Sequence, residues 1–161
     1  MRTISALFTA LGMLLAPAVL AQAPDPRITA ADVEAIAKLP VHVVATGKAV
    51  GAGPGVNFAT ADGKMLLMVV FGDSALYERA KAQKEMKMGN TTMPMVLFHA
   101  AVPGIGDEAF DSPPGAVQYI IYLRKGAKAA SVTTYFERNG KTTRLTIDQV
   151  QSIAKVVASR I

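Results

Sequence analysis

Four methionines lie within ten residues of one another, and their spacing could form a soft metal site. Thioether sulfur suits Cu(I), and it remains a ligand in an oxidising compartment where thiols would not. The candidate ligands are two Met-x-Met pairs and the histidine that follows them: Met86, Met88, Met93, Met95 and His99. The hypothesis expects both pairs to converge through an irregular backbone around Gly89. The alternative is that these methionines pack in the core, at a helix end and in a loop.

A second candidate site joins an acidic pair to basic residues of the C-terminal half. The residues predicted to bind a ligand or a partner are Asp107, Glu108, Arg124, Lys125 and Arg138. Adjacent carboxylates on an extended chain point to opposite faces, so this pair alone does not predict a glycosidase. The alternative is structural: the glycines of 104–110 (GIGDEAF) allow positive φ, Asp107 bonds nearby backbone N–H groups, and Phe110 anchors the loop. The basic residues then form a solvated rim.

No set of residues predicts a catalytic centre. The chain has no cysteine and no Gly-x-Ser-x-Gly motif, and its two histidines lie in apolar, strand-like stretches. Neither a His-x-His nor a His-Glu-x-x-His motif occurs, so a zinc or calcium site is not expected. The remaining enzymatic alternative is a hydrolase in which His42 or His99 acts as general base beside an acidic residue.

The first 21 residues have the features of a cleavable secretory signal peptide. Arg2 supplies a positive charge, the run 4–19 is uncharged and mostly apolar, and small residues precede the expected cleavage after Ala21 or Ala23. No later segment is apolar for long enough to span a membrane. The sequence therefore predicts a signal peptide over 1–21, a linker over 22–28, and one domain over 29–161 in the periplasm or outside the cell.

Composition limits the partners of the domain that would remain. Cleavage would remove Arg2 alone among the charged residues and leave a net charge of about +4. So modest an excess on an exported protein does not favour nucleic acid as the partner. Because the chain has no cysteine, packing alone must hold the domain together.

The elements that must position these residues follow from caps, turns and periodicity. Thr29 and Thr146 each begin a capping box before an amphipathic helix, and Asp62-Gly63 and Asn139-Gly140 favour tight hairpin turns. A further helix is predicted from Asp73 to about 88, and 103–115 is expected to be irregular. Strands are predicted over 41–45, 56–61, 64–71, 95–100, 117–124, 128–138 and 141–145. The fold class is α+β: an antiparallel sheet of about five to seven strands with helices packed mainly on one face.

The segment PGIGDEAF, the strand and turn in YLRKGAKAASV, and the closing LTIDQVQSIAKVVASRI resemble a group of small exported bacterial domains of uncharacterised function. Similar segments occur in secreted actinobacterial lipoproteins and in extracellular sensor domains of bacterial kinases. The resemblance covers roughly 100–161 and implies a non-enzymatic envelope domain without catalytic residues. We therefore expect a non-catalytic periplasmic or secreted domain that binds a small ligand or an envelope protein. No cofactor is expected unless copper occupies the methionine cluster.

Overall fold

The computed structural model describes residues 27–44, 54–113, 118–135 and 145–161. The predicted signal peptide, most of the linker, the glycine-rich stretch 45–53, Arg138 and the Asn139-Gly140 turn lie outside these ranges. The helices are α1 (Ala30–Ala37), α2 (Ser74–Ala82) and α3 (Ile147–Arg160). The strands are β1 (Val41–Val44), β2 (Gly55–Thr60), β3 (Met65–Asp73), β4 (Glu85–Met88), β5 (Thr91–Pro94), β6 (Ala100–Ala101), β7 (Glu108–Asp111), β8 (Gln118–Lys125) and β9 (Lys128–Tyr135).

Seven of the strands form one antiparallel sheet in the order β1-β2-β3-β9-β8-β7-β6. Strands β1 to β3 pair with their neighbours in the chain, and so do strands β6 to β9. The β3–β9 pairing joins these two groups into one sheet. The β2–β3 turn lies at the predicted Asp62-Gly63, where Gly63 has φ of 76° and its N–H donates to the Thr60 carbonyl. The α+β class and the predicted strand number are confirmed.

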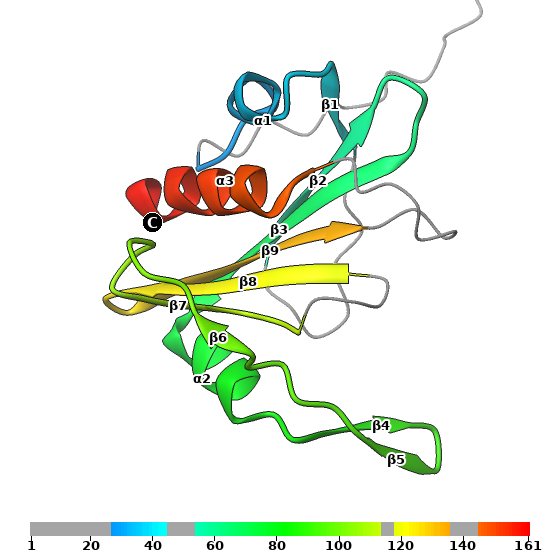
Figure 1. Cartoon of the computed structure of the whole chain (residues 1–161), viewed down its shortest axis with the longest axis vertical. Helices are drawn as coiled ribbons and strands as arrows, with labels where there is room; N and C mark the ends of the chain where they lie inside the picture. Colours follow the sequence, from blue (N-terminus) through cyan, green and yellow to red (C-terminus); the bar gives the residue numbers. More distant parts are fainter. Residues whose placement is uncertain (1–26, 45–53, 114–117, 136–144) are drawn as a thin grey trace, which may run out of the picture.

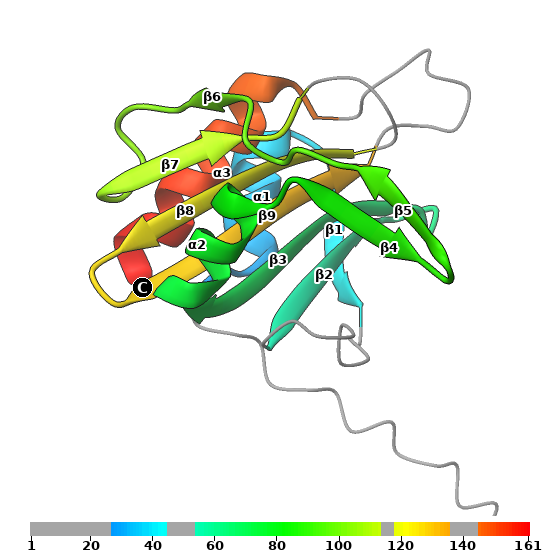
Figure 2. The ribbon, with the colours of Figure 1, turned by 90° about the horizontal axis from the view of Figure 1, so that it is seen from below.

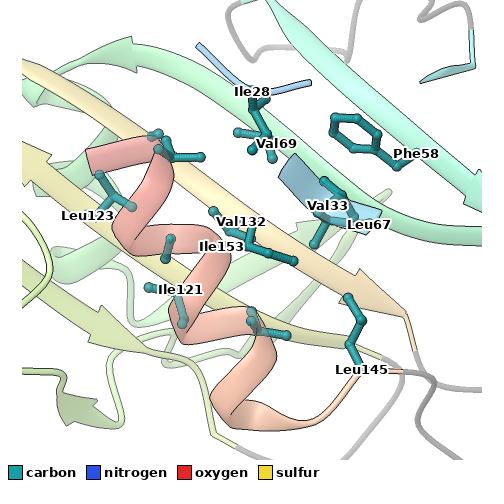
Figure 3. Packing of buried hydrophobic residues seen from close by; sticks show 14 of the residues in the cluster. Ile28, Val33, Phe58, Leu67, Val69, Ile121, Leu123, Val132, Leu145 and Ile153 are labelled. Atoms are coloured by element: carbon teal, nitrogen blue, oxygen red, sulfur yellow. The ribbon is translucent and has the colours of Figure 1, made fainter. Parts of the chain in front are cut away.

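Two of the three helices cover one face of the sheet, and α2 covers the other (Figure 1). The main hydrophobic core lies between the sheet and the α1–α3 layer (Figure 3). It includes Ile153 of α3, Val132 of β9 and Leu67 of β3, each fully buried. The periodic apolar residues of α3 all face this core, as an amphipathic helix requires.

The two helices of this layer begin at the predicted capping boxes. Thr29 and Asp32 cap each other's backbone N–H groups at the start of α1, and Thr146 and Gln149 do the same for α3. A two-pronged ion pair then joins the helices, because both terminal nitrogens of Arg160 lie 2.7 Å from the Asp32 carboxylate. One carboxylate therefore caps α1 and fastens it to α3.

A smaller apolar cluster lies beneath α2 on the opposite face. It centres on Phe110, which packs edge-on against Tyr77 of α2 and stacks on Tyr122 of β8, with ring centroids 5.2 and 5.0 Å away. Met95 and Leu97 join it from the segment that leads to β6. The predicted role of Phe110 as a core anchor is confirmed, since its side chain is fully buried.

The region 83–111 differs from the predicted elements. The helix predicted to run to about 88 ends at Ala82, and Glu85–Met88 pairs with Thr91–Pro94 in a separate two-stranded hairpin. The strand predicted over 95–100 is reduced to Ala100–Ala101, while the supposedly irregular stretch contains β7. In the hairpin, pairing across residues 89–90 outweighs the helix propensity of Glu85–Met88. Strand β7 forms because it pairs with β8, and local periodicity does not reveal such a partner. None of the helices in the described ranges is long and apolar enough to cross a membrane.

Candidate functional site

Asp107 of the predicted acidic pair joins the β6–β7 connection to the turn between β8 and β9. Asp107 accepts a hydrogen bond from the Gly126 N–H at 2.7 Å, and its own N–H donates to the Arg124 carbonyl at 2.8 Å. The expected backbone capping by Asp107 therefore occurs, but its partner lies 19 residues further along the chain. Gly104 and Gly106 have positive φ, as the structural interpretation of this loop predicted.

Glu108 is the centre of a charged network between α2, β7 and β8. Its carboxylate accepts from Arg124 Nη2 at 2.6 Å, from Lys81 Nζ at 3.2 Å and from the Tyr77 hydroxyl at 3.3 Å. Hydrogen bonds from Arg124 and then Lys81 lower the pKa of Glu108, and the same carboxylate raises the pKa of Arg124. Burial is the main cause that raises the pKa of Tyr77 to about 12. The network ties α2 to the sheet.

Of the five residues predicted to bind a ligand or partner, the structure brings three close together and leaves one elsewhere. Asp107, Glu108 and Arg124 meet where β7 begins and β8 ends. Lys125 instead donates to the Ala158 carbonyl of α3 at 3.1 Å. Arg138 lies outside the described residues. The four described side chains are engaged in contacts within the chain, which is what a structural role requires.

His99 lies in a second polar group at the sheet edge. Its Nδ1 is 3.1 Å from Asp111 Oδ1, which also accepts from the Ala100 N–H at 3.0 Å. The other carboxylate oxygen accepts from the Tyr119 hydroxyl at 3.1 Å. Burial of the ring is the main cause that raises the pKa of Tyr119 to about 12, and the charge of Asp111 is the second. In the tautomer that donates from Nδ1 to Asp111, Nε2 is the acceptor nitrogen of the ring.

Sequence reasoning missed Asp111 as the partner of His99, and it missed Tyr119 as the second side chain bonded to that carboxylate. The separation of His99 and Asp111 is 12 residues, and it becomes a contact only because β6 and β7 pair antiparallel across an irregular connection. The sequence offered one weak signal, an acidic residue directly after the buried Ala109-Phe110 pair. His42, by contrast, is an exposed position on the edge strand β1, where it pairs in register with Ala59.

The candidate methionines occupy a regular hairpin rather than an irregular loop, which corrects the expected geometry. In the β4–β5 register Met86 is directly opposite Met93, and Met88 is opposite Thr91. Side chains alternate along a strand, so residues two apart belong to the same face and directly opposite residues share it. The backbone therefore assigns Met86, Met88 and Met93 to one face of the hairpin. Glu85, Lys87 and Thr92 belong to the other.

The hairpin extends away from the seven-stranded sheet (Figures 1 and 2). All four residues of β5 are exposed. Large hydrophobic side chains that remain exposed gather here and in the segment that follows, with exposed fractions of 48% for Met93, 46% for Val96 and 38% for Phe98. We call Met93, Val96 and Phe98 the hairpin surface. Elsewhere in the described residues such side chains are exposed singly, in β1, β3 and α3.

Comparison with models of protein families, with curated proteins and with solved structures finds no significant match to this chain. Among the described residues, no group of three or more histidine, aspartate or glutamate side chains is arranged to hold a metal ion. The site therefore has to be interpreted from its own chemistry.

Proposed function

We propose that this chain is an exported, non-catalytic binding domain that contacts an envelope protein through the hairpin surface. The observation that carries the proposal is that exposed Met93, Val96 and Phe98 lie within six residues of one another, on the projecting hairpin and on the segment that leads from it back to the sheet. Contiguous exposed apolar side chains mark interaction sites, whereas single ones need no explanation. A convex, projecting element suits a macromolecular partner better than a small molecule, because small-molecule sites are concave.

Charge indicates what kind of protein surface would fit. The stretch 78–87, which leads into and through β4, carries four basic and two acidic side chains. We therefore propose a partner with an apolar patch bordered by acidic residues, since complementary rim charges speed association and fix orientation. The predicted residues Asp107, Glu108, Arg124 and Lys125 support this role indirectly, because they hold the strands and α2 in place.

Site-specific photo-crosslinking tests the proposal. A photoreactive residue in place of Met93 should give a discrete cross-linked product in the envelope fraction, and its yield should fall as ionic strength rises. The matched control is the same residue in place of Met65, which is 39% exposed but lies on β3. Equal products at both positions, or none at Met93, would contradict the proposal.

The hydrolase hypothesis remains a second candidate because one specific contact favours it. Asp111 orients the His99 imidazole so that Nε2 is the available base, as a general-base mechanism requires. If the domain hydrolyses chromogenic esters, His99→Asn should lower kcat by about 100-fold or more, while His42→Asn should leave it unchanged. Turnover that is instead lost on replacing Asp107 or Glu108 would contradict both proposals, because it would place catalysis in the charged network.

A further inference from the structure

The chain that leads from the β4–β5 hairpin to β6 contains no turn or bend, and its middle has an unpaired backbone (Figures 1 and 2). At one end the Met95 N–H donates to the Lys84 carbonyl at 2.9 Å. At the other end the His99 N–H donates to the Asp111 carbonyl, also at 2.9 Å. Between these ends, the N–H and C=O groups of residues 96–98 form no hydrogen bond to any described part of the chain. We call residues 96–98 the unpaired segment.

The side chains of the unpaired segment alternate as they do in a strand. Val96 and Phe98 are large and exposed, whereas Leu97 between them is buried in the cluster around Phe110. A period of two is the pattern of an extended chain with one covered face and one open face. The Phe98 ring also contacts the Phe110 ring, with centroids 5.3 Å apart. The segment is therefore extended and anchored, and what it lacks is a neighbouring strand.

The opposite edge of the sheet differs from this one. On β1 the Val41 N–H donates to the Glu34 carboxylate at 2.8 Å, so a side chain of α1 has already taken one of the few backbone donors of that strand. Charged side chains and coverings of this kind protect exposed edges from pairing with other chains. The unpaired segment has no charged residue and no such contact among the described residues.

We propose that the unpaired segment binds an extended peptide segment of the partner protein as an added β-strand. In this mode of recognition, main-chain hydrogen bonds supply affinity and alternate side chains supply specificity. The exposed Val96 and Phe98 favour apolar side chains at every second position of the added strand. The inference deepens the proposed function and rests on it, because it names the class of partner that the hairpin surface receives.

Charge selects a partner peptide over a second copy of this chain. Lys84 lies beside Met95 at the base of the hairpin, and Lys87 follows on β4. Both lysines are exposed, and neither forms an ion pair with a described residue. Glu85 is the one carboxylate between them. Two copies of a chain with a net charge of +5 repel each other, whereas a peptide with acidic residues beside its apolar stretch complements these lysines.

Amide hydrogen exchange of the full chain, followed by NMR, tests strand addition. The probe is a capped peptide of alternating valine and threonine with two glutamates at each end. At about 1 mM peptide and a dissociation constant of about 100 μM, exchange at one or more N–H groups of the unpaired segment should slow by about tenfold. A matched probe with lysines in place of the glutamates should bind at least about threefold more weakly.

Two N-methylated probes separate backbone pairing from side-chain contact. One carries N-methyl groups on its valines and the other on its threonines, so their side chains are identical. In an added strand the N–H groups of alternate residues point to opposite edges, so one methylated probe should lose binding and the other should keep it. Equal binding of the two would overturn the inference, because side-chain contact alone does not distinguish them.

Three other results would also overturn strand addition. They are no slowing of exchange with the glutamate probe, slowing confined to β1, and slowing that appears without peptide as the chain is concentrated, which would indicate a second copy. A cross-linked product at Met93 with no protection of the unpaired segment would reject strand addition and leave the proposed function standing. Protection by the probe with no product at Met93 would uphold the peptide site and reject the envelope partner.

Discussion

At the scale of single residues, the connection between β6 and β7 depends on one position, Gly106, that accepts no ordinary side chain. Gly106 has φ of 61°, and a Cβ there would overlap the Arg124 carbonyl oxygen. That carbonyl also accepts the Asp107 N–H, so the backbone of β8 cannot withdraw without losing the hydrogen bond. A glycine therefore lets the connection that leads into β7 lie directly against the backbone of β8.

Gly106→Ala should lower the free energy of unfolding by about 2–4 kcal/mol, because left-handed strain and a backbone overlap act together. Denaturant titration followed by circular dichroism measures the change. The matched control is Gly104→Ala, where φ is 76° but a Cβ would meet nothing within 4 Å. The control should cost only about 1 kcal/mol, and equal losses in both variants would contradict the role of the overlap.

The Asp32 carboxylate both caps α1 and pairs with Arg160 of α3. Its pKa makes this stabilisation depend on pH. Hydrogen bonding to Arg160, with further bonds from Thr29, holds the pKa of Asp32 well below its usual value of 3.8. A carboxyl with a depressed folded-state pKa stabilises the fold above its unfolded pKa, and this contribution is lost as pH falls through the folded value. The stabilisation is therefore complete near neutrality and declines below about pH 4.

We expect Asp32→Asn to destabilise the domain by about 1–2 kcal/mol at pH 7, since it removes a helix cap and a two-pronged ion pair. The difference in the free energy of unfolding between this variant and the natural chain should shrink as the pH is lowered towards 3. Asp148→Asn serves as a control, because Asp148 is also in the first turn of a helix but is exposed. A difference that is unchanged at low pH would count against this account.

At the scale of elements, the β4–β5 hairpin is an appendage of the domain. Its strands pair only with each other, and none of the hairpin residues whose side chains the structure describes belongs to either apolar cluster. The chain closes at its base, where the Met95 N–H donates to the Lys84 carbonyl at 2.9 Å. This is the hydrogen bond that a two-residue hairpin turn would make.

Replacing residues 85–94 with Asn-Gly should therefore leave the fold intact, because that dipeptide favours a tight turn between Lys84 and Met95. Thermal unfolding should shift by less than about 3 °C, since the described side chains of the hairpin make no part of the core. When the photoreactive residue is placed at Val96, the shortened variant should give less cross-linked product than the natural chain. Loss of the fold would show that the hairpin is part of the structural core.

At the scale of the whole molecule, one sheet serves both apolar clusters. Strand β8 presents Ile121 and Leu123 to the α1–α3 layer and Tyr122 to the α2 side. Because a strand alternates its side chains, neither face can lose its order without affecting the other. The domain should therefore unfold as one cooperative unit.

Ile153→Ala tests this coupling, because it removes a fully buried side chain from the α3 face only. We expect a loss of about 2–5 kcal/mol and a fall in Tm of about 10 °C. Near-ultraviolet circular dichroism, which senses the aromatic cluster around Phe110, should shift together with the far-ultraviolet signal. Separate transitions for the two signals would contradict a single cooperative unit.

Interactions between neighbours in the chain were predictable from the sequence. The capping boxes at Thr29 and Thr146, the Asp62-Gly63 turn and the buried face of α3 depend on residues a few positions apart, so local patterns revealed them. The α+β class followed from the order of these elements. The expected export signal and the absence of cysteine also come from the sequence, and the export signal remains a prediction.

Tertiary structure alone decided the interactions between distant segments. His99 meets Asp111, and Glu108 meets Lys81 and Arg124, only after the sheet has brought their elements together. Pairing also decided the β4–β5 hairpin, where Glu85–Met88 consists of good helix formers and yet forms a strand against Thr91–Pro94. The register of strands that lie far apart in the chain is a property of both strands together, and no single stretch of sequence contains it.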